Sequence, residues 1–115
     1  MPKPRFGTTL MLAALLAGAG MLRLATARAD DADKVEQGHD LYDEYCTTCH
    51  GRDMVNPGGV AFDLRRFPKD GPNGGFDRFR NSVLKGKGQA MPAWRDKLGD
   101  DDVAVLWSYV QTGGK

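Results

Sequence analysis

Three segments of the chain carry apolar residues at the three- and four-residue spacing of a helix that buries one face. The first spans 33–45, with acidic residues before it and in its first turn. The second spans 76–85 and ends at Gly86. The third begins at Asp100, an N-cap followed by two more acids, and ends at Gly113. The pattern predicts three helices, and no segment alternates convincingly as a strand would.

Two loops separate these helices. Residues 51–75 hold three prolines and several glycines, and residues 86–99 contain a methionine followed by a proline. Gly38 interrupts the first helix, although glycine inside a helix costs about 1 kcal/mol relative to alanine. We therefore expect another helix to lie against Gly38, with the ring of Tyr109 or Trp107 as its neighbour.

A single long apolar run lies at the start of the chain. Two basic residues precede the run at 8–22, and the small residues of 27–29 form a cleavage pattern. The run is shorter than the roughly 20 residues that a membrane-spanning helix needs. We predict a cleaved secretory signal peptide at 1–29 and one domain at 30–115. The domain is expected in the periplasm, without stable membrane insertion. The alternative is that 1–29 stays attached as an uncleaved membrane anchor.

Length and charge narrow the classes of function. The 115 residues, 41% hydrophobic and 27% charged, suit one ordinary folded domain. The predicted cleavage leaves 86 residues with 12 basic and 15 acidic side chains, so the basic footprint of a nucleic-acid-binding protein is missing. A domain this small usually needs disulfides, a metal or a buried cofactor to stabilise it.

The cysteine motif is the most informative stretch. Cys46 and Cys49 flank two threonines and are followed directly by His50, as in a c-type haem attachment site. Residues three apart on a helical turn project to the same side, so both thiols can form thioethers with one porphyrin edge. The neutral imidazole of His50 suits the iron. We predict one covalent haem c as the cofactor.

Three other roles for the cysteine pair each lack a supporting feature. A disulfide across so short a loop would restrain the unfolded chain very little. A thioredoxin-like redox pair needs a preceding strand, and no strand pattern precedes Cys46. A zinc site would have only the two cysteines and the two histidines of the chain as ligands, without a second ligand pair at useful spacing.

The second axial ligand of the iron decides its chemistry. Met91 lies about 40 residues after His50, and a thioether there would raise the reduction potential and close the iron to oxygen and peroxide. Met54 follows His50 too closely to reach the other face of a porphyrin, so we expect it in the core, and we expect His39 at the surface. We predict Met91 as the ligand, with a core-filling methionine as the alternative.

Several of these features occur in a fixed order along 33–110. They are Gly38 and Tyr42, the Cys46–His50 motif, Met91-Pro92, and Leu106-Trp107-x-Tyr109. In this order and spacing they resemble small class I cytochromes c. The resemblance implies an all-α fold of three to four short helices wrapped around one covalent haem c, with His50 and Met91 as axial ligands. Members of the family use the carbonyl of a proline after the haem motif to accept the proton of the ligand histidine, a role that the resemblance gives to Pro57.

A narrower likeness concerns the segments around the two methionines. These segments are Met54-Val55-Asn56-Pro57-Gly58, Phe62-Asp63-Leu64-Arg65 and Met91-Pro92-Ala93-Trp94. They look like the monohaem cytochromes that accept electrons from periplasmic quinoprotein alcohol or methanol dehydrogenases. The likeness implies a monomeric electron carrier, with such a dehydrogenase as donor and a cytochrome or terminal oxidase as acceptor. We expect Trp94 beside the haem or a propionate, with plain core packing as the alternative.

Charge is divided unevenly along the chain. Residues 30–46 hold seven acids and one base, whereas residues 65–97 hold nine bases and three acids. We expect the basic half to surround the exposed haem edge and to steer the carrier onto an acidic partner; solvated charges without a docking role are the alternative. No acid/base pair marks an enzyme in its own right. A fixed subunit of a larger oxidoreductase complex, and a peroxidase or gas sensor with an open iron site, are the competing functions.

Overall fold

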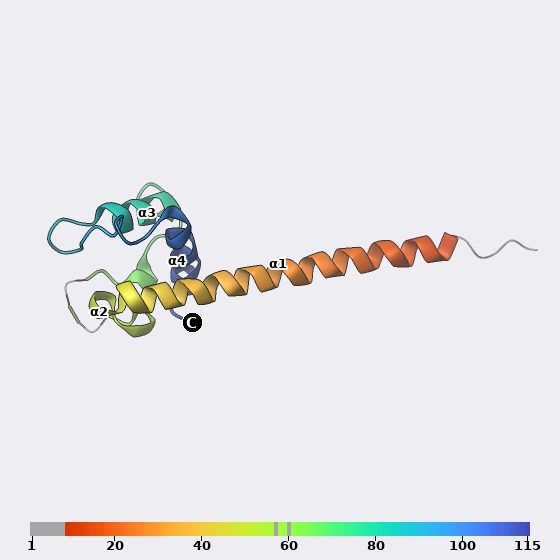
Figure 1. Ribbon diagram of the computed structural model, residues 1–115, viewed down its shortest axis with the longest axis horizontal. Coiled ribbons are helices and arrows are strands. Elements are labelled where there is room, and N and C mark those ends of the chain that lie inside the picture. The colour runs from red at the N-terminus through yellow and green to blue at the C-terminus, as the bar shows by residue number, and fades with distance from the viewer. Residues whose placement is uncertain (1–8, 57, 60) are drawn as a thin grey trace, which may run out of the picture. The chain divides into compact units, whose positions relative to one another are not determined.

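The computed structural model describes residues 9–56, 58–59 and 61–115, and of residues 9–25 the backbone alone. Its elements in chain order are α1 (Thr9–Tyr45), α2 (Thr47–His50), η1 (Arg52–Met54), η2 (Leu64–Arg66), α3 (Gly75–Lys85) and α4 (Asp100–Thr112), drawn in Figure 1. Within the described ranges the β pairing is limited to one isolated bridge between Lys87 and Met91. The all-α prediction is confirmed.

Residues 1–32 and 33–115 form two units. In the first unit α1 begins at Thr9, so the expectation of a helix starting near 33 was wrong. The stretch before 33 is rich in alanine and leucine, which favour helix strongly, and nothing in it stops the helix. Residues 1–8 of the expected signal peptide lie outside the described residues. Among the helices that are described, none is long and apolar enough to cross a membrane.

The ends of α3 and α4 follow from local backbone chemistry. Gly86, with φ of 74°, ends α3, and Gly113, with φ of 73°, ends α4, as the sequence predicts. The expectation that Asp100 is the N-cap of α4 was wrong by one residue, because Gly99 holds that position. The backbone N–H of Gly99 donates to the Asp102 carboxylate at 2.8 Å, and so the third acid closes the first turn.

In the second unit, α1 and α4 meet at Gly38. A Cβ atom on Gly38 would overlap the carbonyl oxygen of Val105 and would lie 2.7 Å from its carbonyl carbon and 3.0 Å from Cβ of Tyr109. The prediction of a helix against this glycine is confirmed, and the neighbouring ring is that of Tyr109. The Tyr109 ring also lies 5.3 Å from the ring of Tyr42, centroid to centroid. Two residues of α1 therefore fix where α4 crosses it.

Aromatic rings fill the space between α3, α4 and the loop that carries η2. Phe67 stands edge-on to Phe79 and to Trp107 at 5.9 Å, and Phe79 lies 5.2 Å from Trp107. Trp107 therefore packs against Phe67 and Phe79 and is not the ring that lies next to Gly38. The fully or nearly buried apolar residues are Tyr42, Met54, Phe79, Val83, Leu98, Val103, Leu106, Tyr109 and Val110. They form one core, and α1, α3 and α4 all contribute to it.

Candidate functional site

A largely apolar cavity of about 430 Å³ brings three of the predicted site residues together. Cys46, His50 and Met91 all line it, although Met91 comes from a loop far along the chain. The walls include Phe62, Phe67, Phe79, Leu106 and Val110. A volume of this size lies within the range of roughly 300–1,000 Å³ that is usual for cofactor sites.

The cysteine motif forms a single helical turn. The N–H of His50 donates to the carbonyl of Cys46 at 2.9 Å, so Cys46, Cys49 and His50 share this turn. No disulfide joins the two cysteines; Cys49 is exposed, and Cys46 is half-buried at the cavity wall. Burial, and then the neighbouring Cys49, raises the pKa of the Cys46 thiol to about 12. The thiol is therefore neutral at physiological pH.

The imidazole of His50 is oriented by a backbone carbonyl. Its Nδ1 lies 3.0 Å from the carbonyl oxygen of Phe62. Because a carbonyl oxygen only accepts hydrogen bonds, this bond requires the proton on Nδ1 and leaves the lone pair of Nε2 available for a metal. Pro57, to which the family resemblance gives this role, lies outside the described residues. Nothing in the sequence around Phe62 marks its carbonyl for this position.

Met91 is held by the backbone of its own loop. The N–H of Lys87 donates to the carbonyl of Met91 at 2.8 Å, and the N–H of Trp94 donates to the carbonyl of Val83 on α3 at 3.0 Å. Gly86 passes so close that a Cβ atom on it would lie 2.6 Å from the Met91 carbonyl oxygen. Met54, in contrast, is fully buried in the core and is not among the cavity-lining residues.

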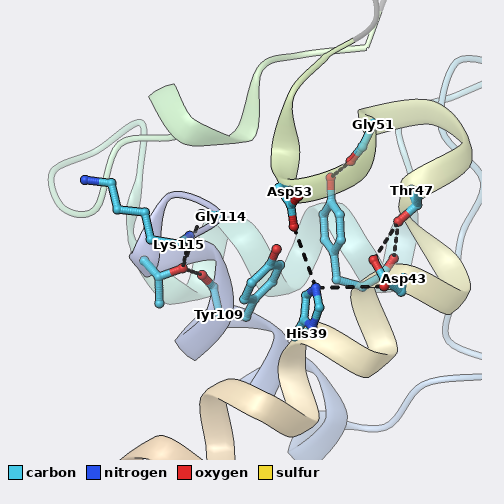
Figure 2. Close-up of polar contacts among 10 residues, drawn as sticks. His39, Asp43, Thr47, Gly51, Asp53, Tyr109, Gly114 and Lys115 are labelled. Atoms are coloured by element: carbon cyan, nitrogen blue, oxygen red, sulfur yellow. Dashed lines mark hydrogen bonds and ion pairs between the residues drawn. The ribbon is translucent and has the colours of Figure 1, made fainter.

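Trp94 and His39 lie away from the cavity lining. The Trp94 ring packs against Tyr45 at a centroid distance of 5.3 Å, edge to face, which favours the core-packing alternative. His39 is half-buried rather than fully solvent-facing. Its Nε2 lies 3.8 Å from both the Asp43 and the Asp53 carboxylates, and its ring lies 4.8 Å from the ring of Tyr109 (Figure 2).

A buried hydroxyl fixes the start of the loop that follows His50. Tyr42 is wholly buried, and its hydroxyl donates to the carbonyl of Gly51 at 2.8 Å. Burial is the main cause that raises the pKa of Tyr42, so the hydroxyl stays protonated and remains a donor. This bond ties the residue after His50 to α1.

The rim of the cavity is basic in part. Arg78 and Lys87 line the cavity and are exposed. Two other arginines of the basic half are neutralised by ion pairs: Arg65 with Asp63 at 2.8 Å and Arg80 with Asp100 at 2.7 Å. Among the side chains that the structure describes, the large apolar ones that are exposed are Val55 and Phe62, each 55% accessible, and Phe62 also lines the cavity. The exposure of these two side chains is a feature that the sequence did not reveal.

The donor set fits an iron porphyrin attached through thioethers. A thiol pair lies on one helical turn, an imidazole with a free Nε2 follows it, and a thioether reaches the same apolar cavity from a second segment. Soft sulfur and imidazole nitrogen are the axial ligands that haem iron accepts. Flat aromatic and aliphatic walls would cover the porphyrin faces and keep water from them.

Comparisons with known proteins point the same way. The family described as cytochrome c oxidase, cbb3-type, subunit III matches residues 33–110. The chain is 31% identical over 94 residues to the oxidase subunit CcoP of Azospirillum brasilense, covering 76% of this chain and 32% of that protein. It is 30% identical over 82 residues to the quinohemoprotein alcohol dehydrogenase ADH IIB of Pseudomonas putida, covering 70% of this chain and 11% of that protein.

A third relative is of similar size to this chain. Cytochrome c6 of Euglena gracilis is 30% identical over 79 residues, which cover 65% of this chain and 87% of that protein. By comparison, the chain spans only about a third of the oxidase subunit and about a tenth of the dehydrogenase. No solved structure matches the chain significantly.

Proposed function

The chain belongs to the cytochrome c oxidase, cbb3-type, subunit III family of cytochrome c domains, and from this premise we propose which residues hold its haem and which proteins it serves. Like its family, it is an electron-transfer protein with covalently attached haem c, and not an enzyme. Haem c supplies a one-electron couple between Fe(III) and Fe(II). The contribution of the polypeptide is to hold, shield and tune that couple.

The proposed ligands are those that converge on the cavity. Cys46 and Cys49 would form the thioethers, and Nε2 of His50 and the sulfur of Met91 would bind the iron. The convergence of Cys46, His50 and Met91 on one cavity is the observation that carries this assignment. A methionine ligand raises the reduction potential and excludes oxygen, which suits a carrier better than a peroxidase or a gas sensor.

The proposed donor is a quinoprotein alcohol dehydrogenase, and the proposed acceptor is a terminal oxidase or a cytochrome that feeds it. Two quinohemoprotein alcohol dehydrogenases of Pseudomonas putida are among the relatives, and so are two cbb3-type oxidase subunits. The signal peptide proposed at 1–29 would place the carrier in the periplasm, where such a dehydrogenase works. We propose that the carrier is monomeric.

The rim of the cavity offers a docking surface for these partners. Arg78 and Lys87 are exposed there, and the exposed ring of Phe62 adds apolar contact area. A basic rim steers association with an acidic partner and makes the rate fall as salt is added. Redox encounters of this kind bury little surface and are short-lived.

A fixed haem subunit of a larger complex is the second candidate. It is favoured by the relatives named as oxidase subunits and cytochrome bc1 subunits, of which this chain spans only a part. A carrier should leave its partner during gel filtration at moderate salt, whereas a subunit should elute with the complex. The elution volume therefore separates the two functions.

The test of the proposed function uses the exported protein in periplasmic extract of its host. Visible spectra are recorded before and after a short-chain alcohol is added, and then after air is admitted. A methionine-ligated ferric spectrum that turns ferrous with alcohol supports both the ligands and the donor. A low-spin haem c that stays ferric would contradict the dehydrogenase as donor, and a high-spin spectrum would contradict Met91 as ligand.

A further inference from the structure

The loop between η1 and η2 is closed by one side chain. Oδ1 of Asn56 accepts hydrogen bonds from the N–H groups of Gly58 and Gly59, at 2.9 and 3.1 Å. Its Nδ2 donates to the carbonyl of Ala61 at the other end of the loop. The amide group of Asn56 therefore joins both ends of the segment that leads to Phe62.

Little else in the described part of this segment could place the Phe62 carbonyl. Gly58 and Gly59 are exposed, and a Cβ atom on either would meet no atom within 4 Å. The side chain of Phe62 is 55% exposed, and its ring meets Phe67 edge-on at 6.4 Å, a contact that positions the ring rather than the backbone carbonyl. The half-buried Asn56 is the residue whose hydrogen bonds reach across the loop. On the far side of Phe62, the Asp63 carboxylate accepts from the N–H and the guanidinium of Arg65 and starts the η2 turn.

We propose that Asn56 is the positioning residue for the iron ligand His50. By closing the loop, Asn56 holds the carbonyl of Phe62 against Nδ1 of His50, and that carbonyl in turn sets the ring orientation and the basicity of the imidazole. A hydrogen bond from Nδ1–H makes the imidazole a stronger donor to the metal. A stronger donor favours Fe(III) over Fe(II), so Asn56 keeps the reduction potential lower than it would otherwise be. This proposal rests on the proposed role of His50 as ligand.

The experiment compares three variants of the haem-loaded full chain. Asn56→Ala removes all three bonds. Asn56→Ser keeps a short oxygen that can accept from the Gly58 N–H but cannot reach Ala61. Asn81→Ala, at an exposed position on α3, removes the same amide group away from the loop and serves as the matched control. Two quantities are measured: the reduction potential, and the solvent exchange rate of the His50 Nδ1 proton by NMR.

The expected result is graded. In Asn56→Ala the Nδ1 proton should exchange at least tenfold faster than in the unchanged protein. The Fe(II) to Fe(III) ratio at fixed solution potential should rise about threefold, which is about 28 mV at 59 mV per tenfold change for a one-electron couple. Asn56→Ser should lie between, and Asn81→Ala should match the unchanged protein. If Asn56→Ala does not fold, the serine variant carries the same comparison.

Two results would overturn the proposal. In the first, Asn56→Ala matches Asn81→Ala in both the exchange rate and the potential. In the second, the potential moves while the Nδ1 proton stays protected, which would mean that the loop acts on the haem by another route. Failure of the proposed function has a different signature, because the unchanged protein would then lack a histidine- and methionine-ligated spectrum, while the exchange rate would still report on Asn56.

Discussion

Replacing Gly38 with alanine should destabilise the second unit by about 2 kcal/mol. The added Cβ would overlap the Val105 carbonyl oxygen and lie 2.7 Å from the carbonyl carbon, so it meets backbone rather than a side chain that can rotate away. Forcing extra methyl groups into a packed contact costs typically 1–3 kcal/mol, and a backbone obstacle lies at the upper end of that range. Alanine returns up to about 1 kcal/mol of helix propensity, which leaves the net loss of about 2 kcal/mol.

The assay is denaturant unfolding of the haem-loaded protein, followed by far-ultraviolet circular dichroism and extrapolated linearly to water. For a domain of this size the loss corresponds to a fall in Tm of roughly 8–16 °C. Gly59→Ala is the matched control, because a Cβ atom there meets no atom within 4 Å, and its stability should change by less than about 0.5 kcal/mol. A Gly38→Ala protein that is more stable than the unchanged one would refute the close crossing of α1 and α4.

Three further predictions concern the site and its rim. Met91→Leu should lower the reduction potential and let carbon monoxide bind the ferrous protein, which visible spectra would reveal; an unchanged spectrum would exclude Met91 as ligand. Tyr42→Phe should cost about 1–3 kcal/mol, because the buried carbonyl of Gly51 loses its donor. Burial raises the pKa of Tyr42 above its ordinary 10.0 in the folded protein. The contribution of Tyr42 to the free energy of unfolding is therefore complete below pH 10 and is lost as the pH rises further. In unfolding curves recorded at alkaline pH, the phenylalanine variant should not show this part of the loss of stability. Arg78→Gln combined with Lys87→Gln should slow electron transfer from an acidic partner severalfold at low salt and flatten its dependence on ionic strength in stopped-flow kinetics; an unaltered salt dependence would remove these residues from docking.

The parts of the fold that are predictable from sequence are those with a periodic or fixed-spacing signal. The amphipathic spacing of 76–85 predicts α3 within one residue, and Gly113 ends α4 where its backbone freedom suggests. Gly38 predicts a helix crossing because glycine inside a helix costs about 1 kcal/mol relative to alanine, a cost that the close approach of a second helix can offset. The convergence of Cys46, His50 and Met91 on a cavity agrees with the motif and spacing read from the sequence, and with the axial ligands that the family resemblance implies.

The parts that could not be predicted depend on backbone groups or on competition between neighbours. The carbonyl that meets His50 belongs to Phe62, and any residue type could present a carbonyl there. The N-cap of α4 is Gly99 rather than the expected Asp100, because the carboxylate that closes the first turn belongs to Asp102, three residues after Gly99. Trp94 had two plausible neighbours by spacing, and its position against Tyr45 is set by the path of the 86–99 loop.

The contact between Gly38 and Val105 also sets an order of events in the making of the protein. A ribosome delivers the cysteine motif more than 50 residues before Val105. Until Val105 has been synthesised, α1 has no partner at Gly38, because the two residues lie 67 positions apart in the chain. The crossing of α1 and α4 is therefore a long-range contact, which forms only after the intervening chain has been closed into a loop. In a chain that ends before α4, Gly38 has no neighbouring helix to accommodate and only weakens α1 relative to alanine.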